Sequence, residues 1–123
     1  MIGIDLALDE AGLLVGCGVQ GHAKAGPKGS DVVCAAVSVL TKTALRVLSL
    51  QEGIQVQGCA EEPGVFWMEL EYAPQERDFL FAIGMFLKEG LEAVATEYPN
   101  HCIITTTTEW RGYYGSKAGR QRR

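Results

Sequence analysis

The sequence predicts an α+β fold, in which two long helices cover one face of a mainly antiparallel sheet. Three observations predict it. Short runs that alternate between apolar and polar residues occur in pairs joined by turns, as in β-hairpins. Two much longer segments carry apolar residues at helical spacing. The order of the segments, β-β-α-β-β-α-β, places hairpins before each helix, which is typical of α+β folds.

The first two strands are predicted over residues 2–8 and 13–19. In the first run every second residue is apolar, and these residues are Ile2, Ile4, Leu6 and Leu8. The second run alternates in the same way and has Cys17 on its apolar side. A short turn containing Gly12 joins the two runs, which therefore predict a hairpin.

A loop and then a buried helix are predicted next. Residues 21–30 hold three glycines and a proline, which indicates an irregular and flexible segment. The following twenty residues, DVVCAAVSVLTKTALRVLSL, contain neither Gly nor Pro and predict a helix from Asp31 to about residue 51. Ser30 or Asp31 would cap its first turn.

The second half repeats the arrangement. Strands are predicted over residues 54–59 and 65–72, joined by a turn at 60–64, and a last strand over 102–108. Between them, a second helix is predicted from Pro74 to about Tyr98. Its expected core side holds Phe79, Ile83, Phe86, Leu87 and Val94.

Composition and charge indicate one globular domain with a separate tail. The 123 residues are 47% hydrophobic and 21% charged, as in folded proteins. Residues 109–123 hold five basic residues and one acidic one, so residues 1–108 hold six of the 11 basic and fourteen of the 15 acidic residues, a net charge of -8. We therefore predict a domain over 1–108 that suits a basic partner, and a disordered basic tail over 109–123.

The tail has two interpretations. The favoured one is that Trp110 anchors the last strand and the rest is solvated, with disorder beyond about Arg111. The alternative is contact with RNA, because aromatic and basic residues lie side by side there.

The expected cellular location and the pattern of cysteines both indicate a protein with free thiols. No uninterrupted apolar run reaches the roughly 18 residues of a membrane span, and the first residues do not resemble a secretory signal, so a cytoplasmic location is expected. The four cysteines form no C-x-x-C pair and are expected to be free thiols. His101 and Cys102 lack ligand-like spacing toward His22 and Cys34, so neither a metal nor another cofactor is predicted.

The stretch from Gly21 to Ser38 carries the strongest functional signal. His22 follows a strand, and Cys34 falls in the first turn of the predicted helix. The amino end of a helix has the equivalent of roughly half a positive charge, which favours the reactive thiolate, and a nearby imidazole would serve as its base. Taken alone, a single Cys–His pair is a weak motif, and core filler or a solvated histidine explains it as well.

The run G-H-A, a Gly-rich loop and then G-x-D-x-V-C-A-A-x-S resembles the bacterial ribosomal-processing cysteine protease family, usually called Prp. That resemblance implies a homodimeric cysteine endopeptidase that removes a short N-terminal extension from a large-subunit ribosomal protein, the twenty-seventh by its traditional number. It implies Cys34 as nucleophile, His22 as base and Asp31 as a supporting residue or simply a helix cap. The loop would act as a substrate lid. The substrate-binding positions it implies are Gly21, Ala23, Lys24, Gly26, Lys28, Gly29 and Ser38.

Two other functions remain open at this point. A non-enzymatic, ribosome-associated binding module would leave Cys34 as an inert thiol. An esterase or thioesterase would use the same dyad on another substrate.

Overall fold

The computed structural model describes residues 1–21, 27–59 and 65–108, and for residues 27–31 it describes the backbone alone. The order of its elements confirms the predicted one. They are β1 (Ile2–Leu8), β2 (Leu14–Gln20), α1 (Pro27–Ser49), β3 (Ile54–Cys59), β4 (Val65–Tyr72), the 3-10 turn η1 (Pro74–Glu76), α2 (Arg77–Glu97) and β5 (Cys102–Thr107). The turn predicted at 60–64 lies outside the described residues.

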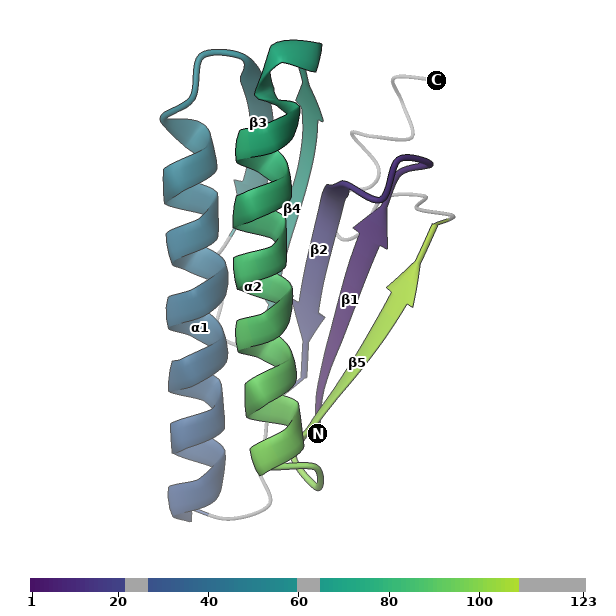
Figure 1. The fold of residues 1–123 in the computed structure, drawn as a ribbon. Coiled ribbons are helices and arrows are strands. Elements are labelled where there is room, and N and C mark those ends of the chain that lie inside the picture. The colour runs from purple at the N-terminus through teal and green to yellow at the C-terminus, as the bar shows by residue number, and fades with distance from the viewer. Residues whose placement is uncertain (22–26, 60–64, 109–123) are drawn as a thin grey trace.

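The five strands form one mixed sheet in the order β3-β4-β2-β1-β5. The pairs β1–β2, β2–β4 and β3–β4 are antiparallel, so the sheet is mainly antiparallel as predicted. The β1–β5 pair is parallel. Figure 1 shows the reason: α2 returns the chain to the end of the molecule where β1 begins, so β5 must run in the direction of β1.

Both helices lie on the same face of the sheet, and the core is the layer between (Figure 1). The strand register aligns apolar side chains from neighbouring strands, because Leu6 lies opposite Cys17 and Cys17 lies opposite Met68. All three side chains are fully buried. Burial of this apolar layer is the main force that holds the helices to the sheet.

The second helix buries a slightly different side from the predicted one. Leu80, Leu87 and Leu91 are its buried residues, whereas Phe86, expected in the core, is 70% exposed. Phe86 adjoins the buried Leu87 in sequence, and adjacent residues lie about 100° apart around a helix, so a narrow contact with the sheet excludes it. Gly90 allows close packing of the two helices, since a Cβ atom there would lie 3.0 Å from the side chain of Leu40.

The first helix begins earlier than predicted. It includes Pro27 and Gly29, which the sequence analysis placed in a loop, and it ends at Ser49. Proline favours the first helical position, because its missing N–H has no helical partner there and its φ is already helical. Ser30 and Asp31 therefore lie inside the helix and do not cap it.

Residues Val32–Ser49 of α1 have the length and the mean hydropathy, 1.6, of a membrane span. This is weak evidence for one, because Lys42 and Arg46 interrupt the segment and a core helix gives the same values. Buried residues recur along this helix every three or four positions: Val33, Val37, Thr41, Ala44 and Leu48. The buried Thr41 hydroxyl donates a hydrogen bond to the Val37 carbonyl oxygen at 2.8 Å. Because this polar group has a partner, its burial destabilises the core little.

The carboxylate of Asp9 links the β1–β2 hairpin to β4 by hydrogen bonds. Asp9 accepts hydrogen bonds from the backbone N–H groups of Ala11 and Leu13, both at 2.9 Å, and from the Tyr72 hydroxyl. Partial burial would raise the pKa of Asp9, but the hydrogen bonds from Tyr72, Leu13 and Ala11 outweigh it and lower that pKa below 3.8. The same bond raises the pKa of Tyr72.

Candidate active site

The candidate site lies at one end of the molecule, where β2 ends and α1 begins (Figure 1). The start of β1 and the end of α2 meet at the same end. In the sequence, Gly21 and residues 22–26 separate β2 from α1.

Gly21 sets the direction in which the chain leaves β2. Its φ is +95°, a left-handed conformation that disfavours every residue with a side chain. A Cβ atom at this position would also lie 2.5 Å from the Met1 carbonyl oxygen. The backbone at Gly21 therefore passes directly against the first residues of β1.

Replacement of Gly21 by alanine is expected to destabilise the fold by about 2 kcal/mol, because it adds both left-handed strain and a clash with Met1. Urea unfolding of the purified variant measures this. Gly3→Ala is the matched control, since a Cβ atom at Gly3 on β1 meets nothing within 4 Å. Equal midpoints for the two variants would show that the Gly21 geometry is dispensable.

Cys34 is the eighth residue of α1, counted from Pro27. It is half-buried and packs against the core. A thiol in this position combines a fixed backbone with access from solvent, which a nucleophile needs.

The predicted placement of Cys34 in the first helical turn is wrong, because α1 starts four residues earlier than expected, at Pro27 instead of Asp31. Two turns of helix now separate Cys34 from the amino terminus. The effect of the helix dipole falls off within the first turn, so it contributes little to this thiol. A catalytic role for Cys34 would therefore require a neighbouring side chain as its base.

Two of the other three cysteines, Cys17 and Cys102, are buried in the core. Burial, together with the negative charge of Asp5, raises the pKa of Cys17 to about 12. Burial also raises the pKa of Cys102. Both thiols therefore stay protonated at neutral pH and unreactive, as predicted for core cysteines. Cys59 is half-buried at the end of β3. All four are free thiols.

The structure describes only part of the predicted site. His22, Ala23, Lys24 and Gly26, with most of the expected lid, lie outside the described residues. Lys28, Gly29 and Asp31 have backbones in α1, and their side chains are not described. Ser38 lies one turn after Cys34 and is half-buried, so the two share one side of the helix.

His101 lies at the same end of the molecule, which the sequence alone did not indicate. Its carbonyl oxygen accepts a hydrogen bond from the N–H of Ile2 at 2.8 Å. Gly21 packs against the other side of the same segment, at Met1 and Ile2. The position of His101 follows from the parallel pairing of β5 with β1. The sequence analysis predicted antiparallel hairpins and therefore did not predict that pairing.

No group of three or more His, Cys, Asp or Glu side chains is arranged to hold a metal ion within the ranges 1–21, 32–59 and 65–108.

Comparison with known families assigns the chain to the cysteine proteases, a class of hydrolases. The profile of the family described as cysteine protease Prp matches residues 1–103, and the chain belongs to this family. A search of curated proteins finds no match.

Solved structures share the fold. The essential ribosomal processing protease Prp from S. aureus, in complex with a substrate peptide, is 19% identical with a TM-score of 0.72, covering 86% of this chain and 99% of that one. The same protease with a covalently linked product peptide is 20% identical, with the same coverage and TM-score. SMU.848 from Streptococcus mutans is 22% identical with a TM-score of 0.72, covering 89% of this chain and 96% of that one.

Proposed function

We propose that this chain is an endopeptidase that removes a short N-terminal extension from a large-subunit ribosomal protein, the twenty-seventh, during ribosome maturation. Cys34 is the nucleophile and His22 is its base, with Asp31 in support. The observation that carries the proposal is membership of the cysteine protease Prp family over residues 1–103, together with the half-exposed position of Cys34 on α1.

The reaction follows from the chemistry of the two groups. His22 takes the proton of the Cys34 thiol, and the thiolate attacks the carbonyl carbon of the scissile peptide bond. The imidazolium returns the proton to the leaving amine as the C–N bond breaks, which leaves a thioester on Cys34. His22 then deprotonates a water molecule that hydrolyses the thioester and frees the enzyme.

The charge of the domain supports a basic substrate. Residues 1–108 carry a net charge of -8, from six basic and fourteen acidic residues. An excess of one sign raises the local concentration of oppositely charged ligands and their association rate. Lys and Arg neutralise nucleic-acid phosphates, so a substrate that binds ribosomal RNA is expected to be basic.

A binding module without enzymatic activity is the alternative, and thiol reactivity separates the two. Limited alkylation with iodoacetamide at neutral pH, followed by peptide mapping, ranks the four cysteines. An activated Cys34 is expected to react well ahead of Cys59, the other half-buried thiol, while Cys17 and Cys102 react last. If Cys34 reacts no faster than Cys59, the enzymatic proposal fails.

We further propose that the protein is a cytoplasmic homodimer. An apolar groove between α2 and the β1–β2 hairpin supports self-association, since Phe81 and Met85 on its rim are 54% and 47% exposed. Sedimentation equilibrium tests the proposed homodimer, and a monomer at micromolar concentration would refute it.

A further inference from the structure

The strand β5 (Cys102–Thr107) forms one edge of the sheet. Among the described strands it pairs with β1 alone, and Figure 1 shows it at the side of the sheet. The N–H of Ile2 donates to the His101 carbonyl oxygen, and the parallel register continues without a shift to Thr107. Bonding groups alternate along a strand, so the odd-numbered residues of β5 bond to β1. The backbone N–H and C=O groups of Ile104 and Thr106 therefore point to the outer edge.

This edge lacks the features that usually protect a free strand. Proteins place charged residues, prolines or bulges on exposed edges, because unpaired N–H and C=O groups recruit other chains. The sequence of β5, CIITTT, contains no charged residue and no proline, and its pairing with β1 keeps one register. Ile103 is 56% exposed, and Thr105 and Thr106 are also exposed. Such an edge can accept an added strand.

The surroundings of the edge favour a basic segment. An open groove beside it is lined by Glu92, Ala95 and Thr96 of α2 and by Cys102, Ile103 and Ile104 of β5. From Glu89 to its last residue, Glu97, α2 carries three glutamates and no basic residue. Lys88 pairs with Glu92 at 3.1 Å and offsets one of these charges. The carboxyl end of the helix adds partial negative charge, so Lys and Arg side chains are attracted here.

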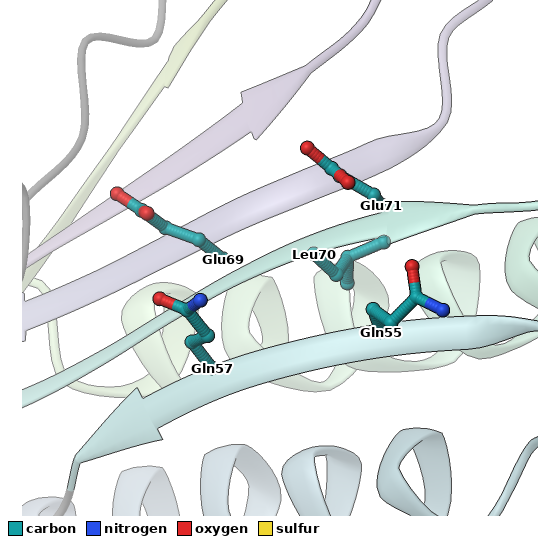
Figure 2. Close-up of a pocket in the computed structure, with 5 residues that line it drawn as sticks. All are labelled: Gln55, Gln57, Glu69, Leu70 and Glu71. Carbon is teal, nitrogen blue, oxygen red and sulfur yellow. The ribbon is translucent and has the colours of Figure 1, made fainter. Parts of the chain in front are cut away.

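The opposite edge of the sheet, β3, suits a basic segment less well. Figure 2 shows the polar pocket on this side, which is lined by Gln55, Gln57, Glu69, Leu70 and Glu71. Gln57 and Glu69 already have interaction partners. The helix that contacts β3 is α1, which carries Lys42 and Arg46 and no acidic residue between Val32 and Ser49. These cations repel a basic chain at the β3 edge.

The position of the β5 edge favours the substrate over a second copy as its partner. β5 begins directly after His101, at the end of the molecule where the candidate active site lies. An extended peptide that passes this end can continue along β5. A second copy paired through the same edge would bring two acidic grooves together, and like charges oppose that arrangement.

We infer that an extended, basic segment of the protein substrate adds to the outer edge of β5 as a sixth strand of the sheet. The inference rests on the proposed function, because it gives the same substrate a second contact outside the catalytic groups. Backbone hydrogen bonds to Ile104 and Thr106 supply affinity, and the glutamates of α2 select for basic sequence. Cleavage of a long substrate then depends on β5, whereas cleavage of a short peptide does not.

Amide hydrogen exchange tests strand addition without cleavage. The Cys34→Ala protein is measured alone and with the uncleaved ribosomal protein. We expect the N–H groups of Ile104 and Thr106 to exchange fast in the free protein and several-fold more slowly in the mixture, whereas Ile103 and Thr105, which bond to β1, exchange slowly in both. Unchanged exchange at Ile104 and Thr106 overturns the inference. Protection before substrate is added would also overturn it, because the edge would already be occupied.

Matched variants of the active enzyme provide a second test. Thr106→Pro removes an outward N–H and keeps the bonds to β1, whereas Thr106→Ala keeps that N–H. We expect Thr106→Pro to raise KM for the ribosomal protein several-fold at unchanged kcat, with cleavage of a short peptide unaffected, and Thr106→Ala to match the wild type.

A charge pair covers the case in which Thr106→Pro does not fold. Ile103→Lys is expected to raise KM for the ribosomal protein and Ile103→Glu is not, with a larger difference at low salt. Equal KM values within each folded pair would overturn the inference and leave the proposed function intact. Failure of the wild-type enzyme to cleave either substrate would instead overturn the proposed function, and the inference with it.

Discussion

Replacement of Cys34 by alanine is expected to abolish peptide cleavage and to leave the fold intact. The substitution removes one sulfur atom from a half-buried position on α1, so the loss of stability is expected to be about 1 kcal/mol or less. Cys34→Ser should fail nearly as completely, because an alcohol is far harder to deprotonate than a thiol at neutral pH. Cleavage of a fluorogenic peptide and circular dichroism measure the two effects.

Cys59→Ala is the matched control for this prediction. Cys59 is also a half-buried free thiol, and it lies on β3 outside the motif that carries the family resemblance. Its variant is expected to cleave at the wild-type rate. Activity that survives in Cys34→Ala and is lost in Cys59→Ala would move the nucleophile to β3.

Replacement of His22 by alanine is expected to slow turnover by a factor of about 100 or more, the usual loss on removing a general acid–base group. The position of Cys34 is a further reason to expect a large loss. Since Cys34 lies two turns into α1, the helix dipole helps little, and the thiolate depends on its base. Steady-state kinetics at several pH values measure the change, and the rate should become proportional to hydroxide concentration near neutral pH.

His101→Ala is the control, because the chain contains only two histidines. His101 lies at the same end of the molecule and contributes a backbone bond to β1 that the substitution preserves. We expect near wild-type kinetics. A loss confined to His101→Ala would transfer the role of base to that residue.

Local patterns predicted most of the fold. Alternating residues fix strands such as β1 and β4 because one face of each is buried, and β3 and β4 have the predicted bounds. The start of α1 was missed because Gly29 was weighed as a breaker, whereas the preceding Pro27 is a favourable first residue of a helix. The parallel β1–β5 pair was missed because it depends on the length and direction of α2, which no local pattern encodes.

The candidate site was likewise predicted in part from local patterns. Cys34 was identified correctly as a residue of α1, and Cys17 as a core residue, because both follow from position within an element. The close contact of Gly21 with Met1 and the presence of His101 nearby depend on long-range pairing and could not be predicted.

Cleavage of the ribosomal protein itself tests the central claim most directly. The host's twenty-seventh large-subunit protein, purified with its N-terminal extension, is incubated with wild-type enzyme or with Cys34→Ala, and its intact mass is measured. The account predicts loss of one short N-terminal segment with the wild-type enzyme and an unchanged mass with Cys34→Ala. An unchanged mass with the wild-type enzyme, or the same cleavage with both, would contradict it.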